Sequence, residues 1–346
     1  MFNKMLAPLD GSTLAEGILP YAAALAKAVG SSITLCYVAD LSSLETPFIG
    51  TQMPHRLYSE ALKHQVASGA VIVSETGRLL ATDAPDSAYQ PHLEQLQQNV
   101  EVKVREYLVG VRKRLAPSGV ALDEAVLFGL PAEQIASYAQ NQGYGVIAMS
   151  THGRSGLGRW AYGSVSDKVL RMSPVPVLLY RSPATGAPGE ARAPRALIVP
   201  LDGSTRAEGI LPYAEELAKK GDMTVHLLRV ATESTYAYWD PAWGAGSWTN
   251  LEQIQQDIQQ AAREYLERVQ KRLERRGVTV VTKVLRGGVA WDIIDYAKDT
   301  PRSLVAMSTH GRSGVGRWLL GSVAEKVLQA AVGPVLIIRP KAGRKG

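Results

Sequence analysis

The residues of this sequence best suited to chemistry are glycines and a serine that recur at one fixed spacing. They are Gly153, Gly163 and Ser164 in the first half of the chain, and Gly311, Gly321 and Ser322 in the second. Glycine has no Cβ, so a phosphate oxygen can approach its backbone closely and successive amides can converge on an anion. The serine hydroxyl can donate to a phosphate oxygen. Each segment therefore predicts a phosphate-binding loop that leads into a helix N-terminus.

A purely structural interpretation of the serine stands beside this one. Ser164 with Asp167, and Ser322 with Glu325, have the spacing of a capping box, which needs no ligand. The agreement between the two halves favours a ligand, because residues 148–171 are about three quarters identical to their repeat, whereas the stretch before them agrees at about a quarter of its positions. A loop with only a structural role would diverge as freely as its neighbours.

A carboxylate follows the first apolar run of each half, in Pro8-Leu-Asp10 and in Pro200-Leu-Asp202. Each Asp could bind ribose hydroxyls or a metal ion. Each could equally form an Asx-turn over the next Gly and Ser and cap the helix that follows. Both interpretations stay open at this point.

Histidines and arginines also occur in the glycine-rich loops. His152 and His310 have no partners at metal-ligand spacing, so we expect no metal site and expect these rings to hydrogen-bond within the loop or to face a phosphate. Arg154 and Arg312 are either solvated surface charges or attract phosphate to the loop.

Longer repeats place these residues in two copies of one domain. Leu-Asp-Gly-Ser-Thr begins at Leu9 and again at Leu201, and Ser-Thr-His-Gly-Arg-Ser-Gly begins at Ser150 and again at Ser308. The offsets are 192 and 158 residues, so the N-terminal copy carries an insertion of 34 residues. We expect two domains, over 1–181 and 196–346, with the insertion within about 45–95 and a linker rich in Pro, Gly and Ala over 182–195.

Within each copy, apolar runs of strand length alternate with helical patterns, which is typical of βαβ units. We therefore expect an α/β fold of two tandem Rossmann-like, doubly wound domains, each a parallel sheet flanked by helices. A helix over about 13–29 contains Pro20, and Pro212 holds the matching place, so we expect a kink or a first-turn position there rather than a break. Residues 71–80 have the pattern of a hairpin around Thr76 and Gly77, so the insertion is expected to carry a β flap.

Composition limits the classes of protein to consider. Apolar residues make up 46% and charged residues 20%, as in ordinary globular proteins. The lone Cys36 lies in the apolar run 33–38, which predicts a buried thiol and a reduced, cytoplasmic compartment. No stretch approaches the roughly 20 apolar residues of a membrane helix. The net charge is +6, but the lysines and arginines are spread along the chain rather than clustered, so we do not expect nucleic-acid binding.

Together these residues resemble the universal stress protein family, whose ATP-binding members carry the pattern G-x2-G-x9-G-(S/T). The two loops fit this pattern from Gly153 to Ser164 and from Gly311 to Ser322. At the position of the pattern's first glycine, this sequence has a serine, Ser150 or Ser308. The family's G-x-P-type turn before the third helix corresponds to Gly129-Leu-Pro131 and to Gly287-Gly-Val289. The likeness covers nearly the whole chain.

The resemblance implies a five-stranded parallel sheet of order 3-2-1-4-5 in each copy, with ATP or ADP as the cofactor and Mg²⁺ as an optional companion. Adenine would lie against the backbone of Val38 or Val230, Asp10 or Asp202 would serve the nucleoside, and the loop would serve the phosphates. The candidate binding residues are Pro8, Asp10, Val38, Gly129, Ser150, His152, Gly153, Arg154, Gly163, Ser164 and Val165 in the N-terminal copy, and Pro200, Asp202, Val230, Gly287, Ser308, His310, Gly311, Arg312, Gly321, Ser322 and Val323 in the C-terminal copy.

Neither copy offers the lysine of a G-x4-G-K-(S/T) loop or a second carboxylate near the glycines, so we expect at most a slow ATPase. The leading hypothesis is a nucleotide-binding stress-response protein that acts as a sensor or regulator through binding. The alternative is a nucleotide-free interaction module of the same fold. Nucleotidyl transfer is a third class, but the S-G-G-x-D-S and H-x-G-H signatures of such enzymes are absent.

The last strand of each copy is expected at 175–180 and 334–338, and both are strongly apolar. An edge strand offers unpaired backbone groups that need a partner, and members of the family commonly pair through this strand. We expect the two copies to form a pseudo-dimer within the chain through these strands. A homodimer through another surface, and a protein partner, are left open.

Overall fold

The computed structural model describes residues 1–40, 71–73, 79–81, 90–152, 163–182, 191–231, 251–309, 320–331 and 333–339. The chain divides into two compact units. One comprises Phe2–Val175 with Ser182–Ala191, and the other comprises Arg192–Gly346 with Pro176–Arg181 and Met1. The first unit therefore holds the N-terminal copy without its last strand, and the second holds the C-terminal copy together with that strand.

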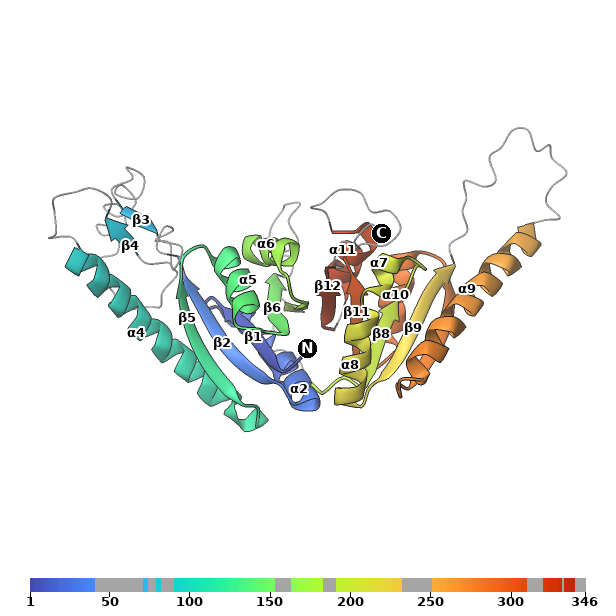
Figure 1. The fold of residues 1–346 in the computed structure, drawn as a ribbon, viewed down its shortest axis with the longest axis horizontal. Helices are drawn as coiled ribbons and strands as arrows, with labels where there is room; N and C mark the ends of the chain where they lie inside the picture. Colours follow the sequence, from blue (N-terminus) through green and yellow to red (C-terminus); the bar gives the residue numbers. More distant parts are fainter. Residues whose placement is uncertain are drawn as a thin grey trace, which may run out of the picture. The chain divides into compact units, whose positions relative to one another are not determined.

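The N-terminal unit is built on a parallel sheet in the order β6-β1-β2-β5 (Figure 1). Its strands are β1 (Lys4–Leu9), β2 (Ser32–Ala39), β5 (Leu122–Phe128) and β6 (Val146–His152). Numbered along the copy, these are strands 4, 1, 2 and 3, so the order agrees with the expected 3-2-1-4. Parallel neighbours require crossover connections, which helices supply here.

The C-terminal unit has the full expected order 3-2-1-4-5, as β10-β9-β8-β11-β12, with every neighbouring pair parallel. Its strands are β8 (Ala196–Pro200), β9 (Thr224–Ala231), β10 (Val280–Arg286), β11 (Ser303–Ser308) and β12 (Val335–Ile338). A sixth strand, β7 (Val177–Ser182), runs antiparallel to β12 and pairs Leu178 with Leu336. The backbone edge of β12 is thus covered by the strand that was expected to meet it.

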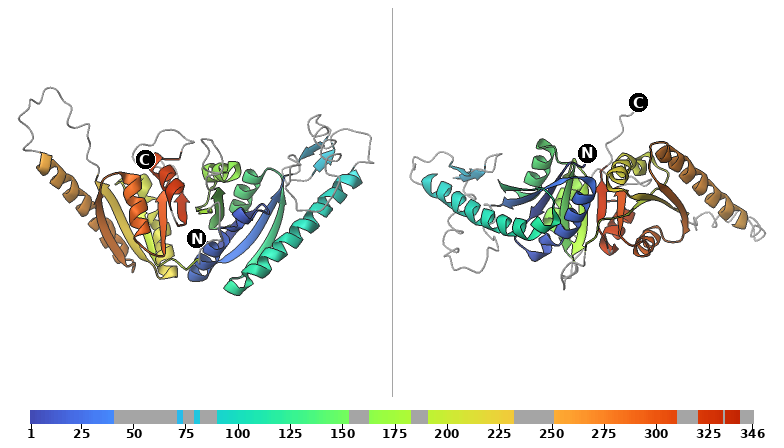
Figure 2. Two further views of the ribbon diagram at one scale, coloured as in Figure 1. Left: turned by 180° about the vertical axis from the view of Figure 1, so that it is seen from behind. Right: turned by 90° about the horizontal axis from the view of Figure 1, so that it is seen from below.

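Helices connect the strands in both units (Figures 1 and 2). In the N-terminal unit they are α1 (Thr13–Glu16), α2 (Leu19–Val29), α4 (Gln90–Leu115), the 3₁₀ turn Ala116–Ser118, α5 (Pro131–Asn141) and α6 (Ser164–Met172). In the C-terminal unit they are α7 (Thr205–Glu208), α8 (Leu211–Gly221), α9 (Leu251–Glu274), α10 (Val289–Lys298) and α11 (Ser322–Ala330). In the N-terminal unit α2 packs beside α4, and α5 packs beside α6.

The single helix expected over 13–29 is two helices. α1 ends at Glu16, and α2 begins at Leu19 with Pro20 in its first turn. Proline lacks an N–H, and its ring collides with the carbonyl four residues earlier in a continuous helix, so the first turn of a new helix is where it fits. α7 and α8 repeat this break at Pro212.

Part of the insertion is described. β3 (Val71–Val73) pairs antiparallel with β4 (Leu79–Ala81), with Ile72 opposite Leu80. These two strands confirm the expected hairpin, whose turn at Thr76 and Gly77 lies outside the described residues.

The sheets form the centre of each core. Met5, Leu6, Ile33 and Leu35 are fully buried in the N-terminal unit, and Leu197 and Ile198 in the C-terminal unit. Cys36 is also fully buried, and this burial raises the pKa of its thiol to about 12, so it stays protonated as an inert core residue. Within the described residues, no helix combines the length and the apolar composition that crossing a membrane requires.

Candidate functional site

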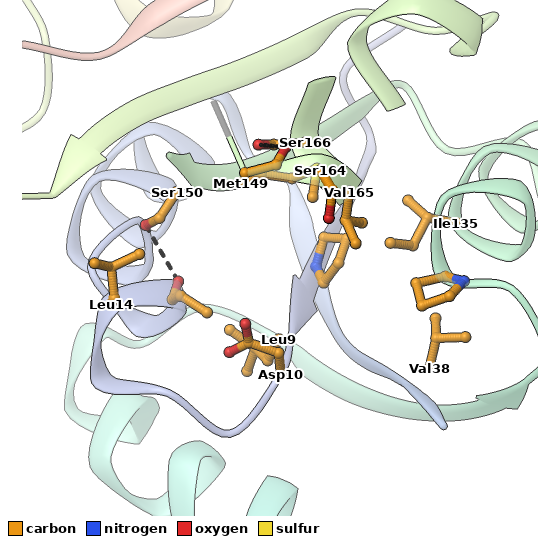
Figure 3. Close-up of a pocket in the computed structure, with 14 residues that line it drawn as sticks. Leu9, Asp10, Leu14, Val38, Ile135, Met149, Ser150, Ser164, Val165 and Ser166 are labelled. Atoms are coloured by element: carbon orange, nitrogen blue, oxygen red, sulfur yellow. Dashed lines mark hydrogen bonds between the residues drawn. The ribbon is translucent and has the colours of Figure 1, made fainter. Parts of the chain in front are cut away.

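The N-terminal unit contains a cavity of about 230 Å³ at the carboxyl ends of β1, β2 and β6 (Figure 3). In open parallel sheets, ligands bind at this edge, where the order of the strands reverses. The residues that line the cavity are Pro8, Leu9, Asp10, Leu14, Ala15, Val38, Pro131, Ile135, Met149, Ser150, Gly163, Ser164, Val165 and Ser166.

Many of the candidate binding residues of the N-terminal copy meet around this cavity. Those in its lining are Pro8, Asp10, Val38, Ser150, Gly163, Ser164 and Val165. Gly153 and Arg154 lie outside the described residues, and His152 is described only as the last residue of β6. Gly129 is not in the lining. It has φ +121° in the turn before α5, and α5 contributes Pro131 and Ile135 to the cavity.

The lining combines apolar and polar side chains along the length of the cavity. Val38 and Ile135 lie at one end of the cavity, and Ser150 and Leu14 lie at the other (Figure 3). Sequence reasoning missed seven residues of the lining, six of them apolar, because apolar residues that line a cavity have the same pattern in a sequence as residues of a packed core. They are Leu9, Leu14, Ala15, Pro131, Ile135, Met149 and the polar Ser166.

The carboxylate of Asp10 makes a local turn. Its Oδ1 accepts hydrogen bonds from the backbone N–H of Ser12 at 2.9 Å and from the Ser12 hydroxyl at 2.6 Å. The Ser12 hydroxyl in turn accepts from the N–H of Ala15 at 3.0 Å and caps α1. Gly11, between them, has φ +86°, which favours glycine. The Asx-turn foreseen from the sequence is therefore present, and Asp10 still lines the cavity.

The capping-box interpretation of Ser164 is wrong. The N-cap of α6 is Gly163, and no side chain caps it. Ser164 is the first residue of the helix, and Asp167 pairs with Arg171 at 2.8 Å instead of reaching back to the cap. The exposed Ser164 hydroxyl has no hydrogen-bond partner within the described residues, so it can donate to a group in the cavity. In the C-terminal copy Gly321 is likewise the N-cap of α11, without a side-chain cap, and Ser322 is the first residue of that helix.

Ser150, which stands at the first glycine of the family pattern, bonds to the wall of the cavity. Its hydroxyl donates to the carbonyl of Ala15 in α1 at 3.2 Å (Figure 3). This bond joins the end of β6 to α1.

The same strand ends carry the candidate residues of the C-terminal copy. Pro200 ends β8, Asp202 follows it, Val230 lies in β9, Ser308 ends β11, and Val323 follows Ser322 in α11. Asp202 Oδ1 accepts from the N–H of Ser204 at 2.9 Å, as Asp10 does from Ser12. His310, Gly311 and Arg312 lie outside the described residues.

Two polar atoms of the C-terminal copy are buried without a hydrogen-bond partner in the described part of the chain. They are the hydroxyl of Ser308 and Oδ2 of Asp292. Asp292 lies against Gly287, whose φ is +141°. Burial, followed by the negative charge of Asp295, raises the pKa of Asp292. Across the described residues of both units, no three His, Cys, Asp or Glu side chains gather in a group that could hold a metal ion.

Comparison with known proteins gives matches along nearly the whole chain. The model of the universal stress protein family matches residues 1–181 and again 194–339. Universal stress protein MJ0531 of Methanocaldococcus jannaschii is 34% identical over 145 residues, which cover 42% of this chain and 82% of that protein. Universal stress protein Slr1230 of Synechocystis is 23% identical over 344 residues, covering 97% of this chain and 100% of that protein. The crystal structure of a universal stress protein from Archaeoglobus fulgidus covers 98% of this chain and 99% of its own, with a TM-score of 0.60 and 20% identity, and shares the fold.

Proposed function

The chain belongs to the universal stress protein family, as a tandem of two copies, and from this premise we propose that it binds an adenine nucleotide, ATP or ADP, at each copy. In this proposal the protein is a cytoplasmic sensor or regulator of the stress response, and nucleotide occupancy is its signal. The observation that carries the proposal is the cavity of the N-terminal unit, where an unpaired serine hydroxyl at a helix N-terminus faces a partly apolar chamber.

The start of α6 is suited to phosphates. The first N–H groups of a helix have no partner within the helix, and the helix dipole favours a negative charge there. Gly163, Ser164, Val165 and Ser166 all line the cavity, so amides of this turn border the same space as the Ser164 hydroxyl. The absence of a side-chain cap leaves this turn open to an external anion.

A second part of the cavity lining is suited to a nucleoside. Val38, Pro131 and Ile135 offer an apolar surface for a flat base. Asp10 Oδ1 is bonded to Ser12, while the carboxylate as a whole borders the cavity and can accept from ribose hydroxyls. Together these two parts of the lining match a molecule with an apolar base, a hydroxylated sugar and phosphates.

The proposed activity is binding rather than turnover. Asp10 is the acidic residue of the described lining, which contains no lysine, histidine or arginine. A general base and a cation that stabilises the transferred phosphoryl group are the parts that phosphoryl transfer requires. We therefore propose at most slow hydrolysis. Mg²⁺ would enter only as a companion of the nucleotide.

One observation favours the alternative of a nucleotide-free interaction module. Asp10 and Ser150 both have structural partners, since Asp10 forms the turn with Ser12 and Ser150 donates to Ala15. In that alternative the loops only shape the fold. Mass spectrometry of small molecules released from the purified protein separates the two, because adenine nucleotide would be recovered only from a binding protein.

A charge placed at Ser164 tests the site directly. In Ser164→Asp, the new carboxylate lies at the first helical position, where the helix dipole stabilises a negative charge, so the fold should be unharmed. The same carboxylate repels a phosphate group. We expect calorimetry to show ATP binding near one per copy in the unmodified protein and loss of one site in the variant. Ser137→Asp, on an exposed position of α5 outside the cavity, is the matched control. An unmodified protein that gives no heat with ATP or ADP would refute the proposal.

A further inference from the structure

A three-residue clamp recurs in both copies, away from the cavity. Glu16 Oε1 accepts from the Tyr107 hydroxyl at 2.9 Å, and Glu16 Oε2 pairs with Arg114 at 2.6 Å. The same bonds join Glu208 to Tyr265 at 2.9 Å and to Arg272 at 2.6 Å. Each carboxylate thus uses both oxygens, one on a tyrosine and one on an arginine, and both partners come from the long helix α4 or α9.

The clamp holds a very short element. α1 has four residues, Thr13–Glu16, and it contributes Leu14 and Ala15 to the wall of the cavity. A single helical turn fixes several backbone angles for very few hydrogen bonds, so it does not hold its position by itself. Its position depends on what fastens it to the rest of the domain.

Three sets of hydrogen bonds hold α1, and each set involves a different part of the helix. The Asp10 turn and the Ser12 cap fix its start, Ser150 bonds to Ala15 in its middle, and Glu16 ties its end to α4. The first two involve residues of the cavity. Glu16, Tyr107 and Arg114 are not in the described lining, so the third set supports α1 without bordering the cavity.

The clamp is electrostatically close to the carboxylate of the site. Burial raises the pKa of Tyr107, the charge of and the hydrogen bond to Glu16 raise it further, and the charge of Asp10 adds to the effect. Burial likewise raises the pKa of Tyr265, and the hydrogen bond to and the charge of Glu208, with the charge of Asp202, raise it further against the opposing charge of Arg229. Each tyrosine therefore stays protonated, so its hydroxyl remains a hydrogen-bond donor to the glutamate of the clamp. The negative charges of that glutamate and of the aspartate of the site both act on it.

We propose that Glu16 with Tyr107 and Arg114, and Glu208 with Tyr265 and Arg272, are positioning residues of the two nucleotide sites, which hold α1 and α7 against the ligand without touching it. This inference rests on the proposed function. The clamp sets ligand affinity because a nucleotide bound beside a displaced α1 would lose contact with Leu14, Ala15 and the Asp10 turn.

A general stabilising role for the clamp predicts something different. The Arg114 side chain is 61% exposed and that of Arg272 is 48% exposed, and ion pairs this accessible to water contribute little to folding stability. A change in Tyr107 that removes only its hydroxyl keeps the ring and its edge-on contact with Tyr37 at 6.3 Å. Positioning therefore predicts a loss of affinity with a small change in the unfolding temperature, whereas a structural role predicts the reverse.

The experiment uses the full chain and ATP, with Tyr107→Phe, Tyr265→Phe and the double variant, each measured by calorimetry and by thermal unfolding. We expect each single change to weaken one site by about fivefold to tenfold and the double change to weaken both. Glu16→Gln, which keeps an acceptor for Tyr107, should lose less affinity than Glu16→Ala. The control is Arg105→Gln, which breaks the 2.6 Å pair with Glu101 on the same helix.

The outcomes separate cleanly. Full ATP affinity in the double variant, with ATP binding intact in the unmodified chain, overturns the positioning role and leaves the proposed function standing. A loss of affinity that only follows a large fall in the unfolding temperature also overturns it. An unmodified chain that binds no nucleotide refutes the proposed function and this inference with it.

Discussion

The two copies carry nearly identical glycine-rich segments on different surroundings. In the N-terminal copy, Leu14 lines the cavity and the buried Tyr37 packs edge-on against Tyr107. In the C-terminal copy, the exposed Arg206 takes the place of Leu14, and Arg229 takes the place of Tyr37. The guanidinium carbon of Arg229 lies 4.8 Å from the centre of the Tyr265 ring. Two neutral side chains of one copy are thus cations in the other.

The copies also differ where the third strand turns into its helix. Gln134 lies beside Gly129 in the N-terminal copy, and Asp292 lies beside Gly287 in the C-terminal copy. Ser150 bonds to Ala15, whereas the buried hydroxyl of Ser308 has no partner among the described residues. Nearly identical loop sequences therefore stand in different surroundings, because the second copy combines extra positive charge with buried polar atoms that have no hydrogen-bond partner in the described part of the chain.

The largest expected effect is at the two glycines. Gly129→Ala and Gly287→Ala each force a side chain into a backbone conformation open mainly to glycine, at a cost of about 1–3 kcal/mol. A Cβ at Gly129 would lie 3.1 Å from the amide nitrogen of Gln134, at the flexible end of a long side chain, and one at Gly287 would lie 3.0 Å from the shorter Asp292 carboxylate. We expect denaturant unfolding to show the greater loss for Gly287→Ala. Equal losses would mean that backbone strain alone decides the cost.

Asp292→Gln gives the C-terminal copy the residue of the N-terminal copy. Because the pKa of Asp292 is raised in the folded state, folding favours its protonated form, and its contribution to stability is lost as pH rises through the folded-state pKa. We expect the neutral amide to stabilise the protein by up to about 1 kcal/mol at pH 7. That gain should shrink as the pH falls and Asp292 becomes protonated. Asp257→Asn, at an exposed residue of α9 whose carboxylate accepts a hydrogen bond from Gln253 at 2.9 Å, is the comparison variant.

We expect His226 to make the stability of the C-terminal copy fall in mild acid. Its Nδ1 lies 2.9 Å from the hydroxyl of Tyr296, and burial lowers its pKa. The unfolded chain, with a histidine pKa of about 6.5, therefore binds its proton first as pH falls, so stability is complete above that value and declines below it. His226→Thr copies Thr34 of the N-terminal copy and should remove the decline. Hydrogen exchange of the β9 amides at pH 7.5 and 5.5 checks this, and an unchanged pH dependence in the variant would contradict it.

The sequence was most informative where a pattern is local or repeated. The strands, the parallel order of the C-terminal sheet and the hairpin at β3 and β4 all followed from periodicity, repeats and resemblance. The expectation of one unbroken helix over 13–29 was wrong, although Pro20 does lie in a first turn, because a local pattern does not decide whether such a proline kinks a helix or begins a new one. The capping box was wrong because the φ and ψ angles of Gly163 decide which residue is the cap, and these angles depend on the loop around it.

The clamp could not be predicted from the sequence alone. Glu16 and Tyr107 are 91 positions apart, and glutamate, tyrosine and arginine are common on helix surfaces. One signal was present, since all three residues recur at the offsets of the repeat, 192 for the glutamate and 158 for the other two. Recurrence of polar residues outside the motif is thus a way to find side chains that support a site from a distance.

The smallest expected effect concerns Arg206, and it tests whether the charge difference between the copies reaches the ligand. Arg206 lies on α7 at the position where Leu14 lines the N-terminal cavity, and its guanidinium has no partner within the described residues. An exposed cation near a phosphate is worth less than about 1 kcal/mol and is screened by salt. We expect Arg206→Leu to weaken ATP at the C-terminal site by about twofold to fivefold in low salt, to weaken adenosine less, and to have no effect at about 1 M salt, where screening acts within about 3 Å. Leu14→Arg should strengthen ATP binding at the N-terminal site under the same conditions.

The control is Arg275→Leu, which changes an exposed arginine that precedes β10 and so lies at the opposite edge of the sheet. Equal losses for ATP and adenosine, or the same loss in the control, would show that the charge of Arg206 does not act on the phosphates of the ligand.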